Sequence, residues 1–362
     1  MSLTSMLQGN TDLEKEFQAI LKEIIPSKKE FFTPSGKTAF SKEYNLIVPY
    51  NLIVPYDSSV VGTAFDYIAR FMIAKKLNKI NEVKERMNAQ KGLEIVDRFT
   101  DKSISNSVRK KYNKNMKKVD SFLSSKNKSP KSIIHSSTFF ARLEHINRSG
   151  MLPSDIETSL LSDEKYEIIY ELSNMVELFE EKILHRLVKT NSEVVFNPHF
   201  GIASAMCGGA DADIYIDGIL YDFKSSKEFG YRWQDIAQLI GYYLLDQISK
   251  KHADENNMLY KHKIDAVAFY KARYGEIEYY NVAPLERGLE LTIIKIEKLL
   301  EPQLDIAKER VAFIDAQNEL ERDQQLRRKL VSERKQKNEQ SIYVKVIIVL
   351  IIIFVFMWLD GY

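Results

Sequence analysis

The chain has 362 residues, with 52 Lys or Arg, 50 Asp or Glu, and a formal net charge of +2. Its length allows one large domain or two modest ones with extensions, and its single cysteine, Cys207, excludes an internal disulfide. The charge is uneven: residues 101–132 hold ten basic and two acidic side chains, a net +8, which leaves −6 for the rest. The first residues lack an apolar stretch of signal-peptide length, so we expect no N-terminal export signal.

Residues 1–162 are expected to form a mainly helical N-terminal region. It contains an exact tandem hexapeptide, NLIVPYNLIVPY, at residues 45–56, whose prolines argue against a central strand. We assign this repeat no function. An amphipathic helix is predicted over residues 58–77, and further helices near 139–147 and over 163–188.

The basic segment, residues 101–132, interleaves Tyr112 and Phe122 with lysines. Such a segment either contacts nucleic-acid phosphates or forms a solvated helix and loop, and the sequence favours neither reading.

Residues 208–227, GGADADIYIDGILYDFKSSK, predict a β-hairpin. Asp217-Gly218 is the two-residue signal of a type I′ turn, and the residues on both sides are rich in Ile, Tyr and Phe. With this turn, Ile216 is expected opposite Ile219, and the apolar side chains of both strands share one buried face.

The same register gathers polar side chains on the other face of the hairpin. Asp213 is expected opposite Asp222, and Asp211 opposite Lys224. Opposed residues have Cβ atoms about 5 Å apart, so two carboxylates in this position repel each other unless a cation lies between them. A divalent metal ion would supply that charge.

The elements around the hairpin predict an α/β core at residues 163–284. A strand is expected at 194–196, a helix over 233–248 and a strand over 264–275, which gives the order αβββαβ. Residues 285–340 are then expected to form a helical stalk with a coiled-coil-like seam, through which the chain could form a homo-oligomer. An equally good reading is a pair of helices packed against the domain.

The C-terminus predicts a single transmembrane anchor at residues 341–362. Residues 346–359 are fourteen consecutive apolar residues, and Tyr343 and Trp358 occupy the places of interfacial aromatics. Residues 327–337 carry six basic side chains and one Glu, which predicts that this side of the anchor stays cytoplasmic. The alternatives are a buried core helix or a hydrophobic terminus used in oligomerisation.

An acid on one strand followed by Asp-x-Lys on the next resembles the PD-(D/E)XK nuclease superfamily. The matching residues are Asp213, Asp222 and Lys224, with Phe223 between the last two. Downstream, QLIGY from Gln238 to Tyr242 resembles the Q-x-x-x-Y motif of the RecB-like branch, whose two named residues share one helix face. The resemblance covers about residues 193–275 and implies a restriction-endonuclease-like core.

A weaker likeness lies in GTAFD, residues 62–66, where that branch often has G-x-x-x-H with a metal-binding His. Asp66 stands in the position of the His here, and a carboxylate can also bind Mg²⁺.

The resemblance implies that Mg²⁺ or Mn²⁺ is held by Asp213 and Asp222, with the Phe223 carbonyl and Asp66 as further ligands. Lys224 would orient the attacking water or stabilise the transition state, with Gln238 and Tyr242 beside it. Asp211 is either another ligand or, as we favour, the ion-pair partner of Lys224. Lys227 and Arg273 are expected to contact nucleic-acid phosphates.

We therefore expect a membrane-anchored, Mg²⁺-dependent nuclease that cleaves DNA, with RNA left open as a substrate. It would act in defence or DNA processing, and its protein partners are unknown. The alternatives are a non-catalytic nucleic-acid-binding membrane scaffold with a nuclease-like fold, and a membrane-stalk assembly protein. Metal-dependent cleavage separates the first reading from the others.

Overall fold

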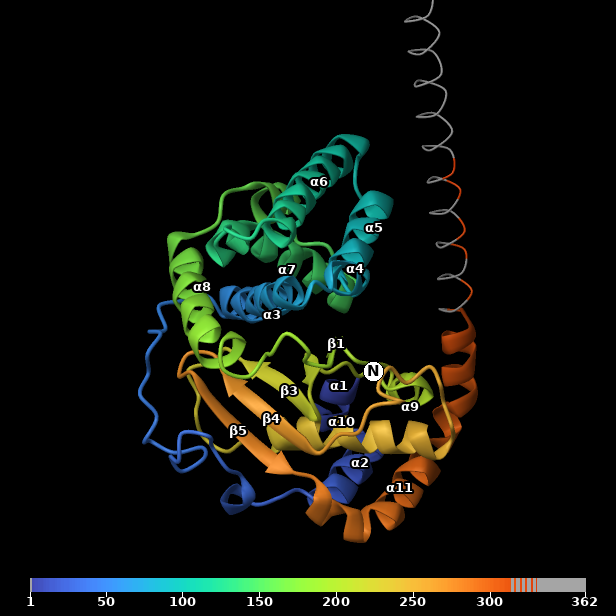
Figure 1. The fold of residues 1–362 in the computed structure, drawn as a ribbon. Helices are drawn as coiled ribbons and strands as arrows, with labels where there is room; N and C mark the ends of the chain where they lie inside the picture. Colours follow the sequence, from blue (N-terminus) through green and yellow to red (C-terminus); the bar gives the residue numbers. More distant parts are fainter. Residues whose placement is uncertain are drawn as a thin grey trace, which may run out of the picture. The chain divides into compact units, whose positions relative to one another are not determined.

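The structure, a computed structural model, describes residues 2–313 together with 316, 320, 323, 327 and 330 (Figure 1). Residues 1–304 form one compact unit and residues 305–362 a second. The expected anchor, residues 341–362, and most of the second half of the stalk lie outside the described residues. Within the part that is described, no helix combines the length and apolar character needed to cross a bilayer.

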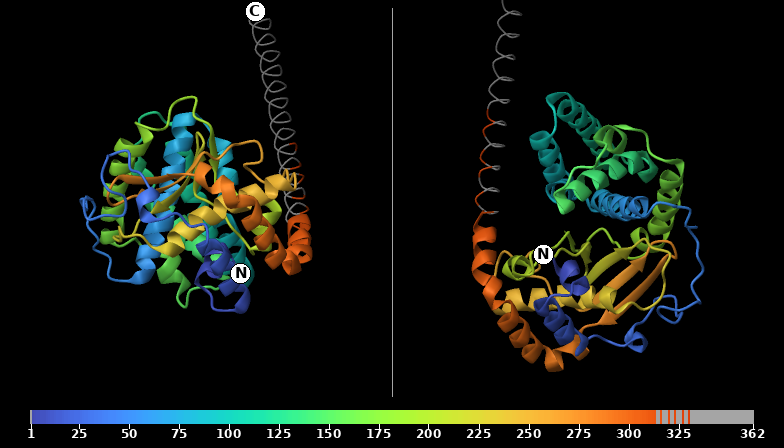
Figure 2. Two further views of the ribbon diagram at one scale, coloured as in Figure 1. Left: turned by 90° about the horizontal axis from the view of Figure 1, so that it is seen from below. Right: turned by 180° about the vertical axis from the view of Figure 1, so that it is seen from behind.

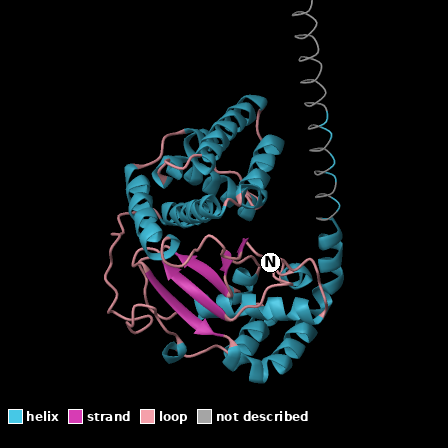
Figure 3. Cartoon of the chain, viewed as in Figure 1, coloured by secondary structure: helices cyan, strands magenta, loops and turns pink. Residues whose placement is uncertain are grey.

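The first unit is an α/β fold built on a five-stranded mixed sheet in the order β1-β2-β3-β4-β5 (Figure 3). Every neighbouring pair is antiparallel except β3 and β4, which are parallel and joined by the crossover helix α10. The strands are β1 (Val194–Phe196), β2 (Ile214–Ile216), β3 (Ile219–Lys224), β4 (Ala266–Lys271) and β5 (Glu276–Asn281), and α10 is Trp233–Lys251.

Helices cover both faces of the sheet (Figures 1 and 2). One face carries α3 and α8, with α4 to α7 packed beyond them, and the other carries α10 with α1, α2 and α11. These helices are α1 (Leu3–Gln8), α2 (Asp12–Lys22), α3 (Pro55–Leu77), α4 (Ile80–Glu85), α5 (Ala89–Phe99), α6 (Lys102–Ser124), α7 (Ile134–Ser149), α8 (Tyr166–Phe179) and α11 (Glu286–Leu300).

The central helix of the helical layer is α3. Pro55 opens it at the position where proline's missing N–H is not needed, and Asn78 ends it in a left-handed conformation with φ of 57°. The expected amphipathic pattern is wrong for most of its length. Residues 63–74 are all buried, because α7 and α8 cover α3 on one side and the sheet covers it on the other.

Two expected elements differ in extent, and one element was not expected. The long helix expected over 163–188 is α8 followed by a π-helical turn, Glu180–Leu184. A short helix, α9 (Gly201–Met206), lies between β1 and β2 and was not expected. The strand expected over 264–275 ends at Lys271, and a turn containing Gly275 at φ of 64° reverses the chain into β5.

The first half of the expected stalk packs against the domain. Helix α11 contacts α2 and α10 and buries Ile293, Ile296 and Leu300, three residues of the predicted seam. Of the two alternatives for this segment, packing against the domain is therefore confirmed, and this part of the seam is not available for oligomerisation.

The two copies of the tandem hexapeptide occupy different environments. In the first copy, the N–H groups of Ile47 and Val48 both donate to the carbonyl of Arg273, and Val48 is fully buried. In the second copy, Leu52 is buried and Pro55 starts α3. The repeat thus provides a strap along the sheet and then the first residues of the central helix.

Candidate active site

The β2–β3 hairpin has the predicted turn and register. Asp217 and Gly218 have φ values of 46° and 88°, as a type I′ turn requires, and Ile216 pairs with Ile219. The Asp217 side chain fixes the turn by accepting hydrogen bonds from the Ser192 hydroxyl at 2.6 Å and the Glu193 N–H at 2.7 Å.

This register carries Asp213 and Asp222 to adjacent positions where the hairpin ladder ends. The last ladder pair is Ile214 with Tyr221, and beyond it Asp213 Oδ2 accepts a hydrogen bond of 2.5 Å from the Phe223 N–H. The side chain of Asp213 therefore takes the place of a main-chain partner. Asp222 is buried beside it, in the middle of β3.

Lys224 lies next to this acidic pair. Its Nζ is 2.7 Å from Asp222 Oδ2, close enough for an ion pair although outside hydrogen-bond geometry, and 3.7 Å from Asp235 of α10. Burial by itself would lower the pKa of Lys224, but the charges of Asp222 and Asp235 hold it above its usual value. Lys224 is therefore a charged ammonium at neutral pH.

The Q-x-x-x-Y residues of α10 continue a hydrogen-bond chain that starts at Lys224. Lys224 Nζ donates to Gln238 Oε1 at 3.3 Å, and Gln238 Nε2 donates to the Tyr242 hydroxyl at 2.7 Å. Ile236 and Ile240 are fully buried on other sides of the helix. One face of α10 thus joins the site as a chain from Lys224 to Gln238 to Tyr242.

Asp66 joins the cluster from the opposite layer, on α3. Its Oδ2 accepts a hydrogen bond of 2.7 Å from the buried Arg70, one helical turn later, whereas its Oδ1 is buried without a hydrogen-bond partner. Arg70 also hydrogen-bonds the Asn197 side chain, and the Asn197 N–H donates to the carbonyl of Asp213 at 3.1 Å. Asp66 is thereby tied to the end of β1.

The pKa values of Asp213 and Asp66 are raised by the surroundings of the site. Burial raises the pKa of Asp213 well above its usual value, and the negative charges of Asp66 and Asp222 raise it further. Burial also raises the pKa of Asp66 to about 6, against the lowering effect of Arg70. The Asp66 and Asp213 carboxylates are therefore harder to ionise in the folded protein than in the unfolded chain, unless a cation compensates their charge.

This donor set suits a hard divalent cation. Mg²⁺ and Mn²⁺ prefer carboxylate oxygens, and Asp66 Oδ1 is a buried oxygen with no other partner. Within the described residues, no three His, Cys, Asp or Glu side chains already stand at metal-binding spacing. Each of the three acids has a protein partner instead: Asp66 pairs with Arg70, Asp222 with Lys224, and Asp213 accepts from the Phe223 N–H.

The expectation that Asp211 pairs with Lys224 is wrong. Asp211 instead forms an isolated β-bridge with His199, because the chain before Ile214 leaves β3 and follows the extension of β1. Burial raises the pKa of its carboxyl group, against the lowering effects of His199, Arg148 and Lys91. The role expected of Asp211 belongs to Asp222 and Asp235.

The expectation that Arg273 contacts phosphates is also wrong. Its side chain is fully buried, is ion-paired with the buried Glu171, and donates to the carbonyls of Ser225 and Pro49. It is a structural cation that joins α8, β3 and the hexapeptide strap.

Lys227 is exposed, and its Nζ lies 5.0 Å from the ring centroid of Tyr50. The ring of Phe223 packs against Phe65 and Phe179 in the core between sheet and helices. Lys227 is thus open to solvent, whereas Phe223 serves the core through its ring.

The aromatic residues of the basic segment are not a stacking surface. Phe122 is buried, and the ring of Tyr112 lies 5.5 Å from that of Phe140 in an edge-to-face contact. Helix α6 therefore points these rings inward.

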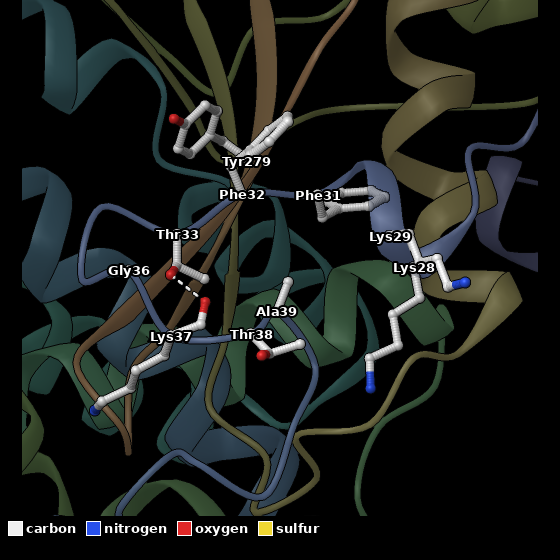
Figure 4. Close-up of a pocket in the computed structure, with 10 residues that line it drawn as sticks. All are labelled: Lys28, Lys29, Phe31, Phe32, Thr33, Gly36, Lys37, Thr38, Ala39 and Tyr279. Atoms are coloured by element: carbon white, nitrogen blue, oxygen red, sulfur yellow. Dashed lines mark hydrogen bonds between the residues drawn. The ribbon is translucent and has the colours of Figure 1, made fainter.

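A separate hollow of about 490 Å³ lies at the β5 edge of the sheet (Figure 4). It is lined by nine residues between Lys28 and Ala39 and by Tyr279, whose ring contacts Phe32. Lys37, one of the nine, pairs with Glu276 at 2.6 Å. None of the site residues named above lines it.

Sequence reasoning missed four charged residues around the site. Asp235 and Arg70 contact Lys224 and Asp66 directly, and Glu144 and Arg148 of α7 act on Asp66 through their charges. The one local signal was the arginine in the apolar run FDYIARFMIA, since a charge in a buried helix needs a partner.

No family model, curated protein or solved structure matches this chain.

Proposed function

We propose that this chain is a divalent-metal-dependent nuclease that hydrolyses phosphodiester bonds of DNA. One observation carries the proposal: the carboxylates of Asp66, Asp213 and Asp222 gather beside the charged Lys224, and an oxygen of Asp66 is buried without a partner. Buried negative charge of this kind is costly unless a cation compensates it.

Asp66, Asp213 and Asp222 would hold Mg²⁺ or Mn²⁺. The bound ion supplies neutralisation of the phosphate charge and acidification of a water molecule. Lys224 stays protonated, and its ammonium group stabilises the anionic oxygens of the reacting phosphate by a hydrogen bond. Gln238 holds the Lys224 ammonium, and Tyr242 holds Gln238.

The same proposal includes attachment to a membrane through residues 341–362, with the nuclease domain on the cytoplasmic side. Its support is the sequence alone: the apolar run of residues 346–359 and the basic residues before it.

The second candidate is a non-catalytic nucleic-acid-binding scaffold. The observation that favours it is the pairing of Asp66 with Arg70 and of Asp222 with Lys224, since paired acids can be purely structural. The two candidates differ in what metal does, because a scaffold gains neither stability nor activity from it.

The test uses the fragment 1–340 with linear and circular DNA in Mg²⁺, Mn²⁺ or EDTA. We expect cleavage in either metal and none in EDTA, and we expect Lys224→Ala and Asp213→Asn to lower kcat by at least about 10³-fold. Lys263→Ala is the control and should cleave normally, because Lys263 is 80% exposed and pairs with Asp265, which bonds Gly218 at the opposite end of the hairpin. Wild-type protein that binds DNA but is inert in every metal would favour the scaffold.

A further inference from the structure

An exposed arginine is held at the acidic site by a buried glutamate. Arg148 lies at the end of α7, four residues after Glu144, and its guanidinium contacts the Glu144 carboxylate. The Arg148 side chain is 61% exposed, whereas that of Glu144 is 1% exposed. The buried Glu144 carboxylate therefore holds one side of the Arg148 guanidinium, while the rest of the arginine side chain is exposed to solvent.

The contacts of Glu144 lead to the candidate active site. Its second oxygen accepts a hydrogen bond of 2.6 Å from the hydroxyl of Tyr67, the residue that follows Asp66 in α3. Burial alone would raise the pKa of Glu144, but Arg148, Arg70 and the Tyr67 hydrogen bond hold it below its usual value. Glu144 is therefore ionised, as its pairing with Arg148 requires.

Arg148 acts on the acidic cluster through its charge. Its charge acts on Asp66 and Asp211 as well as on Glu144, and the charge of Asp213 acts on it in turn. Lys91, at the start of α5, also acts on Asp211, and this end of α5 is tied to the site because the Ala89 N–H donates to the Tyr67 hydroxyl at 3.1 Å. Cations from two helices thus lower the pKa of Asp211, just before the hairpin.

Most of the hydrogen-bonding capacity of Arg148 is unused. A guanidinium has five N–H donors, and within the described part of the chain Arg148 makes one hydrogen bond, to Glu144. The free donors form a planar fork that matches two oxygens of a phosphate.

We propose that Arg148 binds a backbone phosphate of the nucleic-acid strand next to the scissile bond, with Glu144 and Tyr67 as its positioning residues. The inference rests on the proposed nuclease function and assigns the helical layer a part in holding the substrate. The carboxylates of the site alone would repel the negatively charged backbone of a nucleic acid, and the positive charge of Arg148 offsets this repulsion.

The experiment compares Arg148→Met and Arg148→Lys with Arg186→Met in the full chain. Arg186 is the matched control, since its side chain is 63% exposed and it also has a glutamate neighbour, Glu181 at 3.6 Å. Binding of a short fluorescent single-stranded DNA is measured in EDTA over a range of salt concentrations, and KM and kcat are measured in Mg²⁺.

Arg148→Met should weaken binding and raise KM by about tenfold and reduce the salt slope by about one. Arg148→Lys should recover part of the binding, because it keeps the charge but not the fork, and Arg186→Met should match the wild type. A Glu144→Gln variant should weaken binding less than Arg148→Met, because the arginine remains but loses its anchor. Thermal unfolding identifies any variant that has lost its fold. If Arg148→Met is one of them, the comparison of Arg148→Lys with the wild type tests the proposal instead.

Equal binding, KM and salt slope in Arg148→Met and Arg186→Met would overturn this assignment while leaving the nuclease proposal intact. DNA binding that depends on Arg148 without cleavage by the wild type would overturn the nuclease activity alone. A wild-type chain that neither binds nor cleaves DNA would overturn both.

Discussion

Asp66 and Asp213 are two residues of the candidate site whose ionisation opposes folding. Both pKa values are raised by burial, that of Asp66 to about 6 and that of Asp213 well above its usual value. A carboxyl group whose pKa is raised in the folded state binds more protons there than in the unfolded chain. Its stabilising contribution is present below its usual pKa, near 4, and is lost as pH rises through the folded value.

We therefore expect the free energy of unfolding in EDTA to fall by about 1–3 kcal/mol between about pH 4 and pH 6, and to continue falling above pH 6 because of Asp213. Asp213→Asn should remove part of this fall and raise the melting temperature at pH 7.5 by about 2–4 °C. Mg²⁺ should stabilise the wild type at pH 7.5 and have little effect on the variant. Chemical denaturation at a series of pH values measures this, and a flat profile from pH 4 to 8 would contradict it.

The chemistry of single residues could be predicted where their partners are close in sequence. Asp217 and Gly218 specify the turn locally, and Gln238 and Tyr242 share a helix face whatever the rest of the chain does. Arg273 was misread because its partner, Glu171, lies 102 residues earlier. An arginine near a strand end looks exposed until the buried acid that pairs with it is known.

Among the elements, the contact between α5 and α7 depends on one glycine. A Cβ atom added to Gly92 would lie 1.9 Å from the main-chain oxygen of Leu143, which cannot move without displacing α7. This close approach also places Lys91 and Arg148 on neighbouring helices.

Gly92→Ala should therefore destabilise the protein by about 1–3 kcal/mol and weaken DNA binding, because α5 must move away from α7. Gly288, near the start of α11, is the matched control, since a Cβ there has open space. Gly288→Ala should stabilise the fold by up to about 1 kcal/mol, because alanine favours the helix. Urea unfolding of both variants measures the difference, and equal effects would refute the role of Gly92.

The strand that sequence reasoning missed, β5, shows why edge elements are hard to predict. Its Glu276 and Glu278 look like solvent-facing residues, yet both are buried. Glu276 pairs with Lys37 at 2.6 Å, and Glu278 accepts hydrogen bonds from Tyr44 and the Phe40 N–H at 2.8 Å. The N-terminal segment, more than 230 residues earlier, supplies these partners, so no local pattern shows them.

At the scale of the whole first unit, the helical layer and the sheet share one core. The rings of Phe65, Phe179, Phe223 and Tyr270 meet with centroids 5.5–6.2 Å apart, which joins α3 and α8 to β3 and β4. Phe65 precedes Asp66, and Phe223 lies between Asp222 and Lys224. The packing that holds the layers together thus also sets the distance between the acids of α3 and those of the hairpin.

The apolar run of residues 346–359 gives a prediction for the whole molecule that depends on sequence alone. From Ile342 to Leu359 the chain has eighteen residues with one charge, Lys345, which is near the lower limit for spanning a bilayer. The full chain should therefore sediment with membranes and resist extraction by alkaline carbonate, whereas the fragment 1–340 should be released and should cleave DNA in Mg²⁺ with unchanged kcat.

Ile351→Arg is the control for hydrophobic insertion, because an arginine near the middle of the run costs about 2.5–3.5 kcal/mol on insertion. This variant should shift part of the protein out of the membrane fraction without altering cleavage. Protease added outside sealed vesicles of inner-face-out orientation should digest residues 1–304, since the six basic residues of 327–337 resist translocation. Release of the full chain by carbonate would contradict the anchor, and cleavage that is lost with residues 341–362 would indicate that assembly at the bilayer activates the enzyme.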